Sequence, residues 1–218
     1  MIKAIVFDFD GVLADSEPLH LRSYQQVLST LGVTLTRDEY YADYLGYDDQ
    51  GVFTNLAAAH GFALDPRRLE LLIAEKGRAY DAIVASGDVL YPGAAACVAQ
   101  LAAGFPLGIA SGALRREIEA ILRGARIDHH FRFIVASGDT PQSKPAPDPY
   151  RRAAELHGHA PQECLAIEDS RWGIESARAA GLRCIAVTHT YPADQLSMAD
   201  RIVESLAEFT PAFVKGLG

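Results

Sequence analysis

The sequence predicts an α/β fold in which helices flank a parallel β-sheet and one all-helical subdomain is inserted. Short apolar runs end in polar or acidic residues, and stretches with helical periodicity separate most of these runs. Residues 16–90, in contrast, show helical patterns alone. Strands that alternate with helices indicate a parallel sheet, and 218 residues are enough for such a core plus an insert.

The predicted strands are apolar runs that deliver polar side chains at their carboxyl ends. The first run, residues 2–7, leads into Asp8-Phe9-Asp10-Gly11, which indicates a buried strand followed by acidic residues. The later runs are residues 107–110, 131–135, 164–167 and 184–187. They are followed by Ser111-Gly112, Ser137-Gly138, Glu168-Asp169-Ser170 and Thr188-His189 respectively, with one intervening residue in the second case.

The helical patterns fall into two groups. Those at residues 93–103, 115–124, 149–157 and 172–180 alternate with the strands and predict βαβ units. Those at 19–31, 38–45, 51–60 and 66–84 follow one another with no strand between them. We therefore expect a core formed by residues 1–15 and 91–218 and a helical subdomain at 16–90, with Pro92 and Gly93 marking the return to the core.

Composition and charge exclude several classes of protein. Apolar residues make up 49% and charged residues 22%, as in average globular domains, which excludes disordered and collagen-like chains. The net charge of −8 argues against nucleic acid as a partner. No apolar run approaches the ~20 residues of a membrane span, and the first residues lack the pattern of a secretory signal. We expect a cytoplasmic protein that binds no membrane, with a monomer as the simplest state.

The three cysteines give little functional information. Cys97, Cys164 and Cys184 are widely spaced, odd in number and surrounded by apolar residues. This pattern favours buried thiols over a disulfide, a zinc site or a nucleophile.

The chemistry is concentrated where the predicted strands end, because ligands of open parallel sheets bind at that edge. Collected there are Asp8, Asp10, Ser111, Gly112, Glu168 and Asp169, with Lys144 in a nearby loop. Carboxylates from two strands suit Mg²⁺, which also accepts a substrate phosphate oxygen. A hydroxyl, backbone N–H groups and a lysine suit the other phosphate oxygens. Asp8 and Asp10 are two residues apart, so both can address one substrate, one as nucleophile and one as acid and base.

Each motif also has a purely structural interpretation. Asp8 to Gly11 could form an Asx turn, and Ser111 could cap a helix, although a helix N-terminus also binds anions. Lys144 could be a solvated surface lysine. Glu168 and Asp169 could be acidic residues that favour the start of the next helix.

Taken together, the Asp8-Phe9-Asp10-Gly11, Ser111-Gly112, Lys144-Pro145 and Glu168-Asp169-Ser170 segments resemble the four ordered motifs of the haloacid dehalogenase superfamily. The resemblance spans the whole chain. Within the superfamily, the sequence resembles the branch that contains β-phosphoglucomutase and small sugar-phosphate or phosphoglycolate phosphatases. It implies a Rossmann-like core with a helical cap. It also implies Mg²⁺ as cofactor, Asp8 as nucleophile and metal ligand, Asp10 as general acid and base and carbonyl ligand of the metal, and Asp169 as metal ligand. The resemblance further implies that Glu168 lies close to the metal or in its outer shell. It implies that the phosphate is bound by Ser111, Gly112 and Lys144.

The cap residues His20, Lys76 and Tyr80 resemble positions that face the active site in the mutase branch, although His20 could instead be a helix-face histidine and Lys76 a surface lysine. The mutases have an arginine after Gly46 that grips a second phosphate, whereas this chain has Tyr47-Asp48-Asp49-Gln50. Acids there repel a phosphate. After Ser111-Gly112, Ala113-Leu114 stands in place of the hydroxyl and lysine expected in the mutases, and Arg115 could compensate for these two in part.

We therefore expect hydrolysis of a small phosphomonoester, such as a sugar phosphate, through an aspartyl-phosphate intermediate. The alternative is a phosphosugar mutase. A metal-free haloacid dehalogenase and a noncatalytic binding protein are less favoured, because Asp8, Asp10 and Asp169 are all present.

Overall fold

The computed structural model describes residues 1–44, 47–86 and 89–217 and divides the chain into two compact units. The first consists of Met1–Asp15 and Asp88–Gly218, and the second of Ser16–Gly87. The chain therefore returns to the first unit at residue 88, slightly earlier than the predicted end of the helical subdomain at residue 90. Residues 89 and 90 join the first unit because Leu90 pairs with Ala14 in an antiparallel bridge and the Asp15 amide donates to the Val89 carbonyl (2.9 Å).

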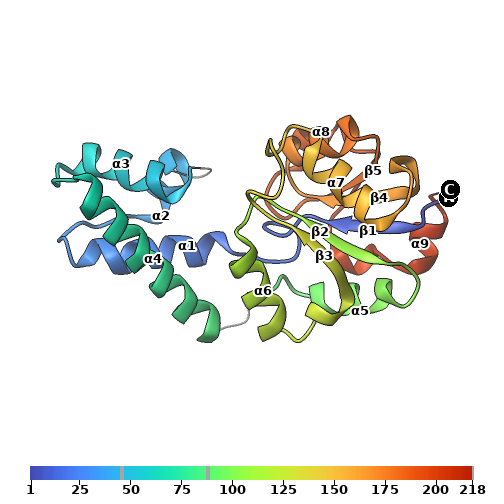
Figure 1. The fold of residues 1–218 in the computed structure, drawn as a ribbon, viewed down its shortest axis with the longest axis horizontal. Coiled ribbons are helices and arrows are strands. Elements are labelled where there is room, and N and C mark those ends of the chain that lie inside the picture. Colours follow the sequence, from blue (N-terminus) through green and yellow to red (C-terminus); the bar gives the residue numbers. More distant parts are fainter. Residues whose placement is uncertain (45–46, 87–88, 218) are drawn as a thin grey trace. The chain divides into compact units, whose positions relative to one another are not determined.

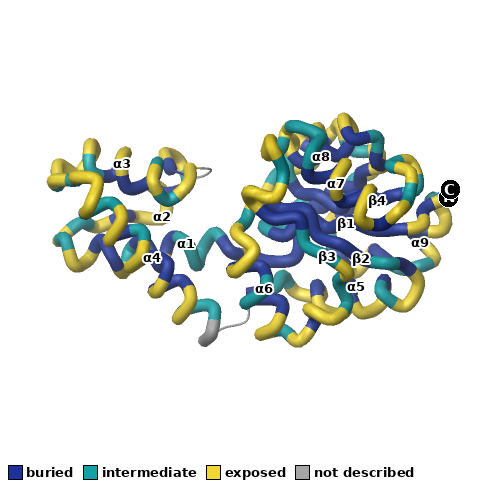
Figure 2. Tube along the Cα trace, in the orientation of Figure 1, coloured by how far each residue is buried: buried dark blue, intermediate teal, exposed yellow. Residues whose placement is uncertain are grey.

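The first unit is built on a parallel sheet with the strand order β3-β2-β1-β4-β5-β6 (Figure 1). The strands are β1 (Ala4–Phe7), β2 (Leu107–Ala110), β3 (Phe131–Val135), β4 (Cys164–Glu168), β5 (Arg183–Val187) and β6 (Arg201–Val203). All four residues of β1 are buried, and the central strands form the dark blue interior of Figure 2. Because β1 lies between β2 and β4, the residues that follow these three strands meet at one edge of the sheet.

Helices cover both faces of this sheet. Those of the first unit are α5 (Ala94–Ala102), α6 (Arg115–Gly124), α7 (Asp148–His157), α8 (Arg171–Ala179) and α9 (Pro211–Lys215), with short 3-10 turns at Asp128–His130, Pro161–Glu163, Ala193–Leu196 and Leu206–Glu208. Helices α7 and α8 pack on one face and α5 and α6 on the other (Figure 1). The Ser170 hydroxyl caps α8 by accepting the Gly173 amide, and Gly158 ends α7 in the left-handed conformation (φ 71°).

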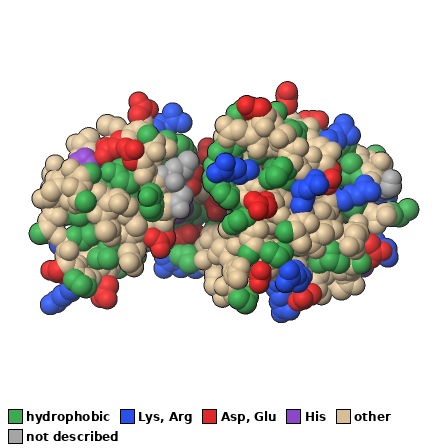
Figure 3. Space-filling model, turned by 90° about the horizontal axis from the view of Figure 1, so that it is seen from above, with side chains coloured by type: hydrophobic (Ala, Val, Ile, Leu, Met, Phe, Trp, Pro, Cys, Tyr) green, Lys and Arg blue, Asp and Glu red, His purple; other side chains and the backbone are tan. Residues whose placement is uncertain are grey.

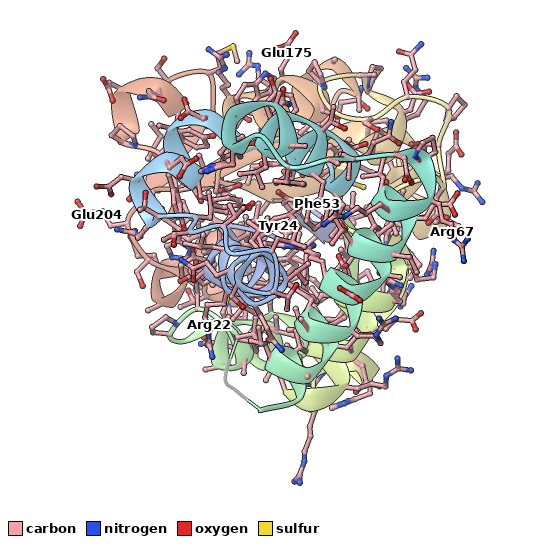
Figure 4. All side chains as sticks on the ribbon, turned by 90° about the vertical axis from the view of Figure 1, so that its left-hand side faces the viewer. Arg22, Tyr24, Phe53, Arg67, Glu175 and Glu204 are labelled. Atoms are coloured by element: carbon pink, nitrogen blue, oxygen red, sulfur yellow. The ribbon has the colours of Figure 1, made fainter. Side chains whose placement is uncertain are left out.

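The second unit is wholly helical in its described residues, with α1 (Glu17–Ser29), α2 (Arg37–Glu39), a π-helix (Tyr40–Tyr44), α3 (Asp49–His60) and α4 (Pro66–Ser86). Its own apolar core includes Tyr24, Phe53 and Leu56. Figure 4 shows Tyr24 beside Phe53 in the interior, with ring centroids 5.4 Å apart, and Arg22 and Arg67 pointing outward. This unit thus buries apolar surface in a core of its own, as an independent subdomain requires.

The structure corrects three element predictions. The expected helix at 38–45 is instead α2 followed by the π-helix, and residue 45 lies outside the described residues. Strand β6 and helix α9 are additional; each is too short to show a periodic pattern, and β6 forms because it pairs with β5. All three cysteines are buried and free, which confirms that prediction.

Two surface properties bear on partners. No helix in the described part of the chain combines the length and the apolar character that a membrane span requires. On the face shown in Figure 3, acidic and basic side chains are interspersed.

Candidate active site

Asp8 directly follows β1, and its position is fixed by the sheet. Its amide donates to the Ile167 carbonyl of β4 (2.9 Å), which joins the ends of the two strands. The side chain is buried, with 8% of the residue exposed, and Oδ1 lies 2.8 Å from Nζ of Lys144. A carboxylate removed from water in this way needs a positive partner, and Lys144 provides it.

Lys144 bridges two carboxylates. The alternative considered from the sequence, a solvated surface lysine without a specific partner, is therefore wrong. Its Nζ lies 2.8 Å from Asp8 and 2.6 Å from Oε1 of Glu168, and 4.9 Å from the ring centroid of Tyr150. Burial alone would lower the pKa of Lys144, but Asp8 and Glu168 outweigh it and raise the pKa, so the ammonium stays charged.

Glu168 is fully buried and its carboxylate is saturated with donors. Oε1 accepts from Lys144 (2.6 Å) and the Tyr150 hydroxyl (2.7 Å). Oε2 accepts from the amides of Asp169 and Ser170 and the Ser170 hydroxyl at 3.1–3.3 Å. A Cβ on Gly173 would overlap this carboxylate, so only glycine fits there. With five donors, Glu168 organises the start of α8 and holds Lys144 in position. Its oxygens are thus already engaged, which agrees with the expectation that Glu168 does not contact a metal directly.

Asp169 completes a cluster of three buried carboxylates. Asp8, Glu168 and Asp169 each offer an oxygen, and these oxygens lie within 4.8 Å of one another. Burial, with a further contribution from Glu168, raises the pKa of Asp8 to about 7, although Lys144 opposes this, and burial likewise raises the pKa of Asp169 well above its ordinary range. If all three were ionised, three carboxylates would face one ammonium, and the raised pKa values express the cost of this excess negative charge.

This donor set fits a hard divalent cation such as Mg²⁺. The ligand atoms are carboxylate oxygens, they converge from β1 and β4, and an added positive charge would offset the excess negative charge. Asp8 and Asp169 are the two carboxylates of the cluster suited to hold it, because the oxygens of Glu168 are already occupied.

Asp10 lies in the tight loop after β1, outside the three-carboxylate cluster. It pairs with Ala14 in a parallel bridge, and the Gly11 amide donates to the Ala14 carbonyl (2.9 Å). The charge of Asp10 contributes to the raised pKa of Asp8, so the two carboxylates are close enough to interact. The loop thus keeps Asp10 near Asp8 without burying it.

Ser111 lies at the same edge of the sheet, at the end of β2, and it is not a helix cap. Its side chain is buried and Oγ accepts the Ala113 amide (3.0 Å), which closes a short turn. Helix α6 begins later, with Leu114 at its N-cap. Space is open around Gly112. Arg115 donates to the Ile134 carbonyl (2.7 Å) and to Asp139 (2.6 Å), so this guanidinium is engaged within the core unit.

The predicted cap residues His20 and Lys76 come together in the interior of the helical unit. Lys76 is 1% exposed, so its interpretation as a surface lysine is wrong. Its Nζ lies 2.8 Å from Oδ1 of Asp49 and donates to Nδ1 of His20 (2.8 Å). The His20 ring stacks on Tyr80, with centroids 4.5 Å apart. Burial and the Lys76 charge lower the pKa of His20 to about 3, although Asp49 opposes this.

The acids of the 47–50 segment have structural partners as well. Asp48 caps α3 by accepting the Gly51 amide (2.7 Å), and Asp49 accepts the Tyr24 hydroxyl (2.6 Å) besides pairing with Lys76. Gly46, after which the mutases have their arginine, lies outside the described residues. Asp49 therefore neutralises the buried ammonium of this unit.

Sequence reasoning missed three residues near the carboxylate cluster. Tyr150 gives no signal, because a tyrosine inside a predicted amphipathic helix is an ordinary core residue. His189 and Thr190 follow β5; from the sequence, His189 is placed at that strand end but not included in the site, and Thr190 lies one residue further on. His189 donates from Nδ1 to the Gly11 carbonyl (3.0 Å), and the Thr190 hydroxyl and the Asp169 carboxylate both lie in the space beside the Gly11 Cα.

Comparison with known proteins identifies the family. The model of the haloacid dehalogenase-like hydrolases matches residues 5–187, which include Asp8, Ser111, Lys144 and Asp169. The chain belongs to this family. It is therefore an enzyme of the hydrolase class, as the motifs predict.

Individual relatives of this hydrolase cover nearly its whole length. Protein CbbY of Rhodobacter capsulatus is 35% identical over 97% of both chains. The phosphoglycolate phosphatase of Escherichia coli K12 is 27% identical over 97% of this chain and 92% of its own. The crystal structure of CbbY from Rhodobacter sphaeroides with phosphate has a TM-score of 0.83, with 30% identity, covering 99% of this chain and all of that one. A mutant of that protein was crystallised with xylulose-(1,5)bisphosphate; it has a TM-score of 0.80 and 30% identity over 95% and 96% of the chains.

Proposed function

We propose that this chain is a Mg²⁺-dependent phosphatase that hydrolyses a small phosphomonoester through a phosphorylated Asp8. The observation that carries the proposal is the buried Asp8 carboxylate, which pairs with Lys144 and lies within 4.8 Å of an oxygen of each of two further carboxylates. Relatives named as phosphoglycolate phosphatase, and a similar structure with a sugar bisphosphate, support a phosphorylated metabolite as substrate.

The charges of the core unit suit a phosphate dianion once a cation is present. Mg²⁺, held by Asp8, Asp169 and the Asp10 backbone carbonyl, would supply charge neutralisation between the phosphate and the carboxylates. Lys144 would offer its ammonium to a phosphate oxygen next to Asp8, and the Ser111 hydroxyl and Gly112 amide would donate to the others. Because these donors are positioned by strand ends, little reorganisation is needed when charge shifts during the reaction.

The chemistry follows from two carboxylates with separate roles. An Asp8 carboxylate oxygen attacks phosphorus while the ester P–O bond breaks, and Asp10 gives its proton to the leaving alkoxide. A water then gives a proton back to Asp10 and attacks the phosphorus, which releases inorganic phosphate and restores the Asp8 carboxylate. Asp10 is acid first and base second, so it needs contact with water, which its half-buried position allows better than the buried position of Asp8.

Hydrolysis is preferred to phosphosugar transfer because a mutase must hold a second phosphate. Arg115, which could compensate in part for the hydroxyl and lysine that the mutases have after the position of Ser111, is bound to Asp139 and a backbone carbonyl. The buried Lys76 is bound to Asp49 and His20. The Arg115 guanidinium and the Lys76 ammonium are thus both bound to groups of the protein itself. Neither is left to bind the second phosphate that a mutase requires.

The test is release of inorganic phosphate from sugar phosphates, sugar bisphosphates, phosphoglycolate and nucleotides, with Mg²⁺ or with EDTA. We expect release from at least one class only with Mg²⁺, and a loss of roughly 10⁴-fold or more in Asp8→Asn. Mass spectrometry of acid-quenched enzyme should show a phosphorylated peptide that contains Asp8. An Asp8→Asn variant with near wild-type turnover would refute the nucleophile, and conversion of a hexose 1-phosphate without phosphate release would favour the mutase.

A further inference from the structure

Two loops of the core unit carry the groups proposed to bind phosphate. Ser111 and Gly112 follow β2, and Lys144 lies in the segment after β3. We propose that Asp139 is a positioning residue, which holds these two loops in register by binding Arg115 and its own backbone turn. This inference rests on the proposed function, because it takes Ser111, Gly112 and Lys144 as the phosphate-binding groups.

The Asp139 carboxylate closes the turn that follows β3. The Asp139 amide donates to the Ala136 carbonyl (3.1 Å), and Gly138 between them has a φ of +86°, which favours glycine. Oδ2 of Asp139 in turn accepts the Ala136 amide (2.8 Å). The residue is thus bonded across the turn through both its amide and its side chain.

The same carboxylate oxygen reaches the other loop through Arg115, the first residue of α6. Nη2 of Arg115 donates to Oδ2 of Asp139 (2.6 Å) and to the Ile134 carbonyl of β3 (2.7 Å). A backbone bond from the Ser137 amide to the Ala113 carbonyl (2.9 Å) also joins the two loops. These contacts tie the start of α6, and the loop before it, to the turn after β3.

The position of the turn is passed on to the phosphate-binding groups. Ala113, whose carbonyl accepts from the turn, donates its amide to Oγ of Ser111 (3.0 Å). Lys144 follows Asp139 in the same connection between β3 and α7. One phosphate needs donors from both loops at once, and misplacement by about 1 Å can cost about 100-fold in rate. Asp139 can therefore affect phosphate binding although its carboxylate is bound to protein groups.

The proposed cation site is built on other strands. Its ligands Asp8 and Asp169 follow β1 and β4, and the Asp8 amide is bonded to the Ile167 carbonyl of β4 (2.9 Å). Loss of the Arg115–Asp139 pair should therefore weaken phosphate binding and leave metal affinity unchanged. A general disturbance of the core would lower both.

The test combines calorimetric titration of inorganic phosphate in the presence of Mg²⁺, steady-state kinetics, and Mn²⁺ binding followed by electron paramagnetic resonance. We expect Asp139→Ala to weaken phosphate binding on the order of tenfold, to lower kcat/KM by up to about 100-fold, and to leave Mn²⁺ affinity unchanged. Asp139→Asn, which keeps an acceptor oxygen, should lose less. Arg115→Ala should resemble Asp139→Ala, and the double variant should lose little more than either, because both act through one pair.

Asp200→Ala is the matched control. Asp200 accepts the Cys184 amide (2.8 Å) and pairs with Arg178 (3.5 Å), so this substitution removes the same two kinds of contact. They lie at the amino ends of β5 and β6, at the edge of the sheet opposite Asp8. Asp200→Ala should therefore keep wild-type phosphate affinity and turnover.

The outcomes separate this inference from the proposed function. The role of Asp139 would be overturned by wild-type phosphate affinity in Asp139→Ala, by tighter binding through the freed Arg115, by an equal loss in Asp200→Ala, or by a parallel loss of Mn²⁺ affinity. A wild-type protein that neither binds phosphate nor releases it from any substrate would overturn the proposed function itself. Should Asp139→Ala unfold the protein, as judged by thermal melting, Asp139→Asn and Arg115→Ala test the same pair.

Discussion

Two lysines with little exposed side chain, 13% for Lys144 and 2% for Lys76, show how similar contacts in the two units can serve different purposes. Lys144 in the core and Lys76 in the helical unit each pair with an aspartate at 2.8 Å and lie close to a tyrosine ring. Around Lys144, three carboxylates face one ammonium. Around Lys76, one carboxylate faces one ammonium, and the third group is a histidine whose pKa is lowered to about 3.

The difference lies in charge balance. The Lys76 cluster is neutral as it stands, since His20 accepts a hydrogen bond from Lys76 and stays uncharged. The Lys144 cluster has carboxylates in excess, which is costly in a buried site unless a cation or protons compensate. Burial of ionic groups is therefore a poor guide to function by itself, and the uncompensated charge distinguishes the cluster that could hold a cation.

The largest expected effect comes from removing each lysine. Lys144→Met leaves Asp8 and Glu168 buried without a cation and should cost about 3–5 kcal/mol of unfolding free energy. Lys76→Met should cost less, about 2 kcal/mol, because water reaches the Asp49 side chain, which is 25% exposed. Urea unfolding with and without Mg²⁺ checks this: Mg²⁺ should recover part of the Lys144→Met loss and leave the Lys76→Met deficit unchanged. Equal recovery in both variants would contradict the charge-balance argument.

A smaller effect is expected from acidification of the helical unit. The pKa of His20 is lowered to about 3 in the folded protein, where it faces Lys76 and Asp49, from an ordinary value of 6.5. The unfolded chain then binds more protons, so the stability contributed by neutral His20 is complete above pH 6.5 and is lost as the pH falls toward 3. Between pH 7 and 4.5, wild type should lose about 2 kcal/mol more than His20→Asn. The exposed His129→Asn serves as control, and parallel curves for wild type and His20→Asn would sink the prediction.

The smallest effect is expected from removing one tyrosine hydroxyl in each cluster. Tyr150→Phe deletes a donor to Glu168, and Tyr24→Phe deletes a donor to Asp49. Each should lower the unfolding free energy by about 1 kcal/mol. Only Tyr150→Phe should also reduce phosphatase turnover, by a few-fold, because Glu168 orients Lys144 next to Asp8. Stability curves and initial rates measured on the same samples decide this, and a similar rate loss in Tyr24→Phe would show that the core cluster has no special role.

Much of the core was predictable because its signals are local. Buried parallel strands are continuous apolar runs, and the residues after them identify the functional edge, so Asp8, Ser111, Glu168 and Asp169 follow from pattern alone. Strand β6 was not predictable, since three residues carry no period and the strand exists through its pairing with β5. The π-helix within 40–44 likewise departs from the regular helical pattern that its sequence suggests.

The sequence by itself determined which residue types stand at the strand ends, and therefore the class of chemistry and the family. Tertiary structure alone decided which of these charges are compensated. Sequence spacing does not show that Glu168 receives five donors or that Lys76 is enclosed with Asp49. The reason is physical: the energy of a charge depends on the water it has lost and the partners it has gained, and both are set by segments far apart in the chain.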